Sequence, residues 1–121
     1  MIFVLTALVG GLGAAARFAL DTALSRRWQE SWLRLMVINV SGSALLGLLA
    51  GLAAQRVVAA DAVFVVGSGF LGGYTTFSAA SLATVRLLEQ RRWVTVLASS
   101  LGMLLSAITA AAIGFLVGRA L

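Results

Sequence analysis

Four long apolar stretches dominate this sequence and limit what it can fold into. They cover residues 2–20, 33–54, 62–85 and 93–117, and only short polar connectors separate them. A helix needs about 20 mainly apolar residues to cross the hydrocarbon core of a bilayer. The pattern therefore predicts an all-α membrane protein, with residues 1–121 forming a single domain of four transmembrane helices surrounded by lipid.

The composition agrees with a membrane protein and argues against an enzyme. The chain is 61% hydrophobic and 11% charged, whereas soluble domains are about 45–50% apolar and about 25% charged. Without Cys or His, it has no thiol chemistry and lacks the commonest general base. The four acidic residues lie between or at the edges of the apolar stretches, so no carboxylate pair stands inside the membrane: Asp21, Glu30, Asp61 and Glu89.

The net charge of +5 comes from arginines that gather at the connectors. This placement indicates anchoring at the membrane surface and not nucleic-acid binding, which needs one basic face. The first and third connectors, with the residues beside them, hold Arg26, Arg27, Arg34, Arg86, Arg91 and Arg92. By the positive-inside rule these connectors are cytoplasmic, so both termini of this multi-pass membrane protein lie outside.

The third apolar stretch contains the unusual sequence Gly67-Ser-Gly-Phe-Leu-Gly-Gly-Tyr-Thr-Thr-Phe-Ser78. Each glycine costs a helix interior up to about 1 kcal/mol relative to alanine. We therefore predict a helix broken near residues 72–76. Non-helical backbone at membrane depth must be covered by protein or by a watery cavity. Its free carbonyls can bind cations and its free N–H groups can bind anions, so an ion site is expected there.

Asn39 is the most polar residue well inside an apolar stretch. Such residues tend to face the bundle interior and to be functional, although an interhelical hydrogen bond is the alternative. Two pairs of small residues at a spacing of four, Gly47 with Gly51 and Gly114 with Gly118, indicate close helix packing.

Arg17 shares one face of the first span with Thr6, Gly10 and Gly13, and Asp21 follows one turn later. The spacing allows an ion pair between Arg17 and Asp21. Arg17 is expected either to extend to the membrane surface, which is the common behaviour near helix ends, or to stand at the mouth of an anion pathway.

Hydroxyl groups recur along the last two spans. Ser78, Ser81 and Thr84 follow one another at every third residue. The fourth span carries a stripe of small and polar residues: Thr95, Ser99, Gly102, Ser106 and Thr109. These hydroxyls either bond to their own helix or line a wet path between the spans. Phe77 is either ordinary apolar surface or a ring whose positive edge meets an anion.

Three motifs in order resemble the bacterial fluoride channel family (CrcB/Fluc). They are Gly10-Gly-Leu-Gly-Ala-Ala-Ala-Arg17, Asn39-Val-Ser-Gly-Ser43 and Gly69-Phe-Leu-Gly-Gly-Tyr-Thr-Thr-Phe-Ser78, and the resemblance covers nearly the whole chain. It implies a multi-pass channel of the bacterial inner membrane that exports cytoplasmic fluoride passively and so confers fluoride resistance. It also implies an antiparallel (inverted) dimer with two narrow pores and a structural Na⁺ at the dimer centre, ligated by the backbone carbonyls of Gly72 and Thr75.

By the same resemblance, Asn39 donates its side-chain N–H to fluoride, Phe77 offers its ring edge and Arg17 stands in the vestibule. Fluoride holds its water strongly, so fixed donors must replace that water in a pore. Our candidates for further donors are hydroxyls on the last two spans: Ser78, Ser106 and Thr109.

One departure from the family bears on the partner. The family usually has a second Phe three residues after the first, where this chain has Ala80. Together with the arginine bias, this favours a dimer with an oppositely oriented paralogue over a dimer of identical chains. The alternatives are a small four-span exporter, a non-conducting partner subunit of a heterodimeric channel, and an accessory protein whose polar stripes only pack helices.

Overall fold

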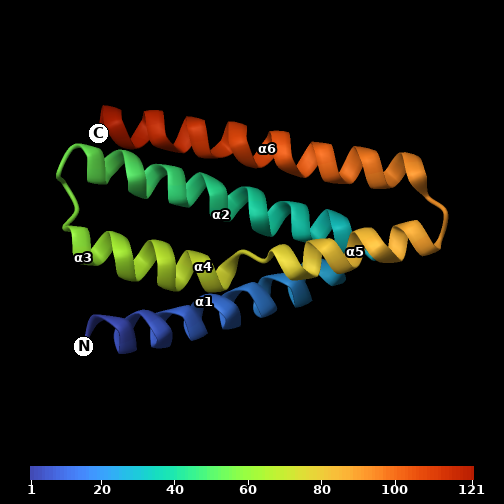
Figure 1. Ribbon diagram of the computed structural model, residues 1–121, viewed down its shortest axis with the longest axis horizontal. Helices are drawn as coiled ribbons and strands as arrows, with labels where there is room; N and C mark the ends of the chain where they lie inside the picture. The colour runs from blue at the N-terminus through green and yellow to red at the C-terminus, as the bar shows by residue number, and fades with distance from the viewer.

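A computed structural model describes residues 1–121, and it is helical almost throughout (Figure 1). The first, second and fourth spans are single helices: α1 (Ile2–Ser25), α2 (Ser31–Ala54) and α6 (Trp93–Ala120). The third span comprises α3 (Ala60–Val63), the π-helix η1 (Phe64–Leu71), α4 (Gly72–Tyr74) and α5 (Phe77–Glu89). All four spans are long and apolar enough to cross a membrane, which confirms the predicted fold class of four transmembrane helices with an interrupted third.

The chain ends and connectors are divided between the two ends of the bundle. Both termini and the connector between α2 and α3 lie at one end, and the other two connectors lie at the opposite end (Figure 1). Most of the arginines therefore share one end, while only Arg56 and Arg119 belong to the end with the termini. This is the asymmetry on which the predicted orientation depends.

The closest helix pair is α2 with α6, and its contact is made by glycines. A β-carbon on Gly47 would overlap the carbonyl oxygen of Ala111, and one on Gly114 would overlap that of Ala44. The same overlap would occur at Gly51 and Gly118 against the partner helix. The two small-residue pairs thus lie on the same interface and allow the two backbones to touch.

Glycines also let the third span approach α1. A β-carbon on Gly73 would overlap the carbonyl oxygen of Gly10, and one on Gly13 would overlap the carbonyl oxygen of Phe70. No glycine in the chain has a positive φ angle. The glycines of the third span therefore serve close packing and do not adopt a left-handed backbone.

The helix of the third span is interrupted just after its glycines and not among them. The backbone stays helical through Tyr74, with a π-helical turn in which the amide of Gly72 donates to the carbonyl of Gly67. Thr75 (φ −79°, ψ 157°) and Thr76 (φ −151°, ψ 118°) are then extended. The glycine-rich segment accommodates the wide turn and the close contact with α1, and the interruption falls on the two threonines that follow.

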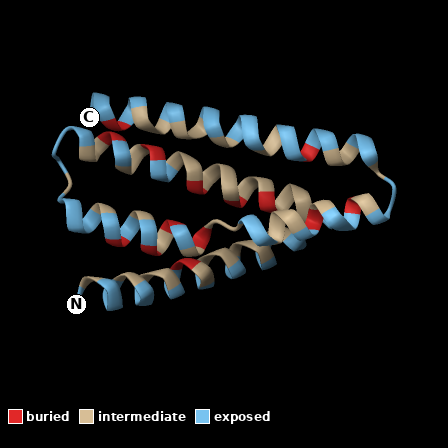
Figure 2. Cartoon of the chain, in the orientation of Figure 1, coloured by how far each residue is buried: buried red, intermediate tan, exposed pale blue.

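The interior of a single subunit is small. Only 14 of the 121 residues are buried, and large apolar side chains are exposed along α1 and α6 in particular (Figure 2). This distribution is the reverse of that in a water-soluble protein, and it leaves broad apolar faces for lipid or for a second subunit.

Candidate ion site at the interrupted third span

The interruption brings two helix ends of opposite polarity together near the middle of the span. The carboxyl end of α4 stops at Tyr74, and α5 begins at Phe77. The hydroxyl of Thr76 caps α5 by accepting a hydrogen bond of 3.3 Å from the amide of Ala79. The negative end of one helix dipole and the positive end of another therefore meet at Thr75–Thr76.

Four consecutive carbonyl groups are left without partners at this point. No backbone or side-chain donor bonds to the carbonyl oxygens of Gly72, Gly73, Tyr74 or Thr75. A helix would have supplied these bonds from residues four positions later, but the chain turns away and the amide of Thr76 goes elsewhere. Free carbonyl oxygens inside a membrane protein are suitable ligands for a cation.

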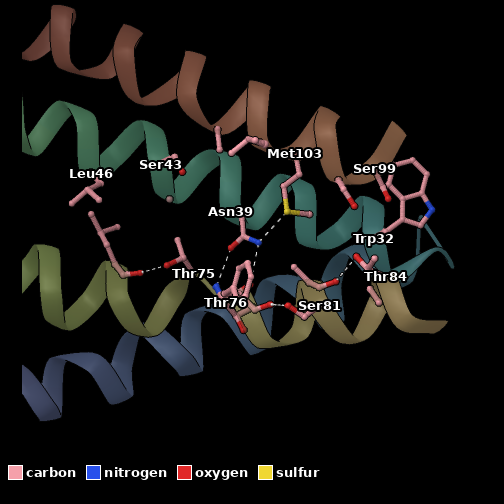
Figure 3. A pocket seen from close by; sticks show the side chains of 18 of the residues that line it. Trp32, Asn39, Ser43, Leu46, Thr75, Thr76, Ser81, Thr84, Ser99 and Met103 are labelled. Carbon is pink, nitrogen blue, oxygen red and sulfur yellow. Dashed lines mark hydrogen bonds between the residues drawn. The ribbon is translucent and has the colours of Figure 1, made fainter. Parts of the chain in front are cut away.

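Asn39 on the neighbouring helix α2 hydrogen-bonds to the interrupted segment (Figure 3). Its Oδ1 accepts a hydrogen bond of 2.9 Å from the amide of Thr76, and its Nδ2 donates to the carbonyl of Thr76 at 3.2 Å. One side-chain amide thus satisfies both backbone groups of a residue that belongs to no helix. The same Nδ2 also points to the sulfur of Met103 on α6, at 3.5 Å.

A second contact holds the start of the interruption. The buried ring of Tyr74 places its hydroxyl 2.9 Å from that of Ser41, which in turn donates to the carbonyl of Ile38. Gly42 makes room for this arrangement, because a β-carbon there would overlap the methyl group of Thr75. Asn39, Ser41 and Gly42 of α2 therefore all contact residues 74–76.

A cleft of about 750 Å³ lies beside the interruption, between α2, the third span and α6. Asn39, Thr76 and Phe77 line it, together with a group of hydroxyl residues: Ser43, Ser81, Thr84, Ser99 and Ser100. Figure 3 shows Ser81, Thr84 and Ser99 on the side of the cleft toward Trp32, with Ser43 beyond Asn39. The walls are mainly apolar, so the few polar groups stand out as places where an ion or water can be held.

The residues of α5 that we predicted as site residues lie at this cleft and on the open surface beside it. Phe77 is 87% exposed although it lines the cleft, and Ser78 is exposed with its hydroxyl 3.2 Å from that of Thr76. Ala80, where the family usually has its second Phe, is half-buried and also lines the cleft.

Ser106 and Thr109 lie away from this cleft. Both are exposed on α6, and neither hydroxyl bonds to its own helix. Ser99, from the same stripe, is buried and donates to the carbonyl of Val96. Ser43 and Ser100 line the cleft but were not among the predicted donors, because their helical spacing gives no sign of which helix they face.

Arg17 does not pair with Asp21, so that expectation was wrong. Asp21 instead accepts from Nε of Arg34 at 2.8 Å, and Arg34 also donates to the carbonyls of Trp28 and Gln29. Arg34 reaches Asp21 across the short connector and is held by three acceptors at once. Arg17 is half-buried, and its Nε has no hydrogen-bond partner.

The fold and the site define a small four-span membrane protein whose few interior polar groups gather beside an interrupted helix. Residues 4–115 match the family described as "CrcB-like protein, Camphor Resistance (CrcB)". The chain belongs to this family, which confirms the resemblance drawn from its three motifs and its assignment as a multi-pass bacterial membrane protein.

Several relatives align over most of both chains. "Fluoride-specific ion channel FluC 1" of Leifsonia xyli subsp. xyli is 41% identical over 119 residues, covering 98% of this chain and 87% of the relative. "Fluoride-specific ion channel FluC 2" of Mycobacterium bovis is 40% identical over 108 residues, covering 88% and 82%. "Fluoride-specific ion channel FluC 1" of Geobacillus kaustophilus is 37% identical over 114 residues, covering 93% and 94%. These relatives are named as channels, in agreement with the prediction that this chain is not an enzyme.

Proposed function

We propose that this protein is a subunit of a fluoride-selective channel that lets cytoplasmic fluoride leave the cell passively. The observation that carries the proposal is the interruption at Thr75–Thr76, found in the middle of a membrane span in a chain of this family. An interrupted span provides unpaired backbone donors and acceptors where an ion must give up its water.

The free carbonyls of residues 72–75 suit a structural Na⁺. We assign the carbonyl oxygens of Gly72 and Thr75 as its ligands, with the same pair from a second subunit completing the set. Both oxygens lack a hydrogen-bond donor within the chain, and uncharged oxygen ligands match a hard monovalent cation. Such an ion would supply a fixed positive charge between the subunits.

On the other side of the interruption the donors suit an anion. The amides of Phe77 and Ser78 begin α5 and find no acceptor in the chain. Asn39 adds a side-chain N–H, and the exposed ring of Phe77 can turn its positive edge to a passing ion. Several donors of moderate strength let fluoride lose its water and still move on. The unpartnered Arg17 is assigned to the vestibule, where its charge would attract anions.

A second, inverted subunit completes this pathway in our proposal. Ser106 and Thr109 carry exposed hydroxyls without a partner, and Phe77 is exposed beside the interruption. Hydroxyls and backbone polar groups facing lipid are unfavourable, so a covering surface that shares a wet path is expected. The fluoride pathway would then include Ser78, Ser106 and Thr109.

The partner is better explained as a paralogue than as an identical chain. An inverted pair of identical chains would need this chain to insert in both orientations, and its arginines lie mostly at one end. Relatives with names numbered FluC 1, FluC 2 and FluC 3 fit organisms that hold more than one such chain. Ala80 in place of Phe further suggests that the partner supplies the missing ring. A non-conducting partner role for this chain is the second candidate.

A coupled four-span exporter is disfavoured by the positions of the acids. Such a carrier normally needs an ionisable carboxylate inside a span. Asp21 lies near the C-terminal end of α1 and is paired with Arg34. Glu30, Asp61 and Glu89 lie at the ends of helices.

The test is fluoride release from liposomes loaded with fluoride, measured with a fluoride electrode. The protein is reconstituted alone and together with a paralogue of opposite arginine bias, and chloride release is measured in parallel. We expect slow release from the chain alone, fast fluoride release from the pair, and little chloride release from either. Fast release from the chain alone would refute the paired assembly, and no release from either preparation would refute the channel.

A further inference from the structure

We propose that the thioether of Met103 is a removable partner of Asn39 and thereby sets how strongly fluoride is held at that amide. The inference rests on the proposed function, because it names a positioning residue for the same pathway. Met103 touches no ion in the proposal. It acts by competing for the N–H that the ion would use.

The geometry divides the three polar contacts of Asn39 into two strong ones and a weak one. Its Oδ1 and one N–H are engaged by the two backbone groups of Thr76, at 2.9 and 3.2 Å. These two bonds fix the plane of the amide, so the second N–H has only one direction available. In that direction lies the sulfur of Met103, 3.5 Å from Nδ2 (Figure 3).

A thioether is a poor hydrogen-bond acceptor. The N–H therefore remains polar and under-satisfied, yet it is shielded from the apolar surroundings while no ion is present. Fluoride is a much stronger acceptor and would replace the sulfur as the partner of this N–H, because hydrogen bonds to charged groups are stronger than those to neutral ones.

Met103 can also withdraw without a change in the backbone. It lies on α6, half-buried, and lines the same cleft as Asn39 and Thr76. Its side chain is unbranched with three rotatable bonds, so a rotamer change can take the sulfur into the cleft. Asn39, in contrast, is held in place by Thr76 throughout.

Removing the acceptor at position 103 should then strengthen fluoride binding, and a stronger acceptor there should weaken it. Met103→Leu keeps a similar volume but removes the acceptor, so the N–H is free and fluoride binds more tightly. Met103→Gln offers a stronger carbonyl acceptor of similar length, which competes with fluoride. Because one neutral hydrogen bond is involved, each change should shift the half-saturating fluoride concentration by about 5-fold, downward for Leu and upward for Gln.

The experiment measures fluoride flux against fluoride concentration in whichever liposome preparation conducts, alone or with the paralogue. Met36→Leu is the matched control, since Met36 is a half-buried methionine of α2 that does not line the cleft. Opposite shifts for the two Met103 variants, with Met36→Leu unchanged, would support the inference. A packing role alone would move both variants in the same direction.

Shifts in the same direction, or none, in a conducting preparation would overturn the role of Met103 and leave the channel proposal intact. Absence of wild-type flux would overturn both. If Met103→Gln does not elute as a folded protein, Met103→Asn supplies the same kind of acceptor on a shorter side chain, and the same upward shift is expected.

Discussion

At the scale of single residues, Asn39 is the side chain on which the interrupted span depends. Its amide replaces the helical hydrogen bonds that Thr76 loses, and it does so from a different helix. Asparagine can do this because it carries an acceptor and donors on one planar group. The same residue then has one N–H left on the cleft side, and this is the donor that our proposal assigns to fluoride.

Asn39→Asp tests this dual role. The carboxylate keeps an acceptor for the amide of Thr76 but loses the N–H donors and adds negative charge beside the pathway. We expect fluoride flux to fall by at least about 10-fold, from the loss of a hydrogen bond to a charged ion. Gln90→Glu is the matched control, since it makes the same amide-to-carboxylate change at an exposed connector residue that does not line the cleft. Flux of Asn39→Asp equal to wild type would contradict the assignment.

Ala80→Phe tests the missing ring. Ala80 lines the cleft one turn after Phe77, so a phenylalanine there would give the chain both aromatic residues of the family pattern. An additional favourable ring edge corresponds to about 2- to 10-fold in flux. Initial fluoride efflux from liposomes with this chain alone should rise by this factor. An unchanged or lower rate would mean that Ala80 does not limit conduction.

At the scale of elements, the bundle is held together by backbone contact. Glycines on α2 and α6 face each other, and glycines on α1 and the third span do the same. Since lipid is as apolar as the side chains it would replace, close contact between backbones is what favours association of these helices. Helix α1 thus holds the glycine-rich part of the third span, and hydrogen bonds from Asn39 and Ser41 of α2 hold the interruption that follows it.

Gly47→Ala should destabilise the contact between α2 and α6, because its β-carbon would overlap the carbonyl of Ala111. Overpacking of this kind costs about 1–3 kcal/mol. The measurement is the midpoint of thermal aggregation in detergent, followed by size-exclusion chromatography. Gly11→Ala is the matched control, since no atom lies within 4 Å of the added carbon. A midpoint for Gly47→Ala equal to that of Gly11→Ala would refute close contact at this position.

Periodicity predicted the spans and the faces of the helices, but not which faces meet. The pairs Gly47 with Gly51 and Gly114 with Gly118 indicated close packing, and nothing in their spacing said that they pack on each other. Likewise, Ser106 and Ser99 belong to one stripe, yet only Ser99 reaches the cleft of this subunit. Contacts between distant segments, such as Asn39 with Met103, depend on helix rotation and tilt, which local sequence does not encode.

The arginines of the whole molecule are unevenly distributed along its long axis. Its termini share one end, and most of its arginines share the other (Figure 1). At the arginine-rich end, Arg34 binds Asp21 and Arg92 binds Glu30, each at less than 3 Å, so the two connectors there are tied to their neighbours. The remaining unpaired arginines of that end favour the cytoplasmic side.

Cysteine labelling tests this orientation cleanly, because the chain has no cysteine of its own. Val57 and Gln90 are exposed in connectors at opposite ends. In spheroplasts, a membrane-impermeant maleimide should label Val57→Cys and should reach Gln90→Cys only after permeabilisation. Equal labelling of both variants before permeabilisation would show insertion in both orientations and would favour a dimer of identical chains.

The central claim, that fluoride crosses through a passive pore, is tested most directly by the charge dependence of fluoride release. Liposomes containing the chain and its paralogue are loaded with potassium fluoride, and efflux is followed before and after valinomycin. Uncoupled fluoride movement builds up a voltage, so we predict that efflux stalls at first and becomes rapid when valinomycin lets K⁺ follow. Rapid efflux without valinomycin, unchanged by its addition, would indicate electroneutral coupled export and contradict the account.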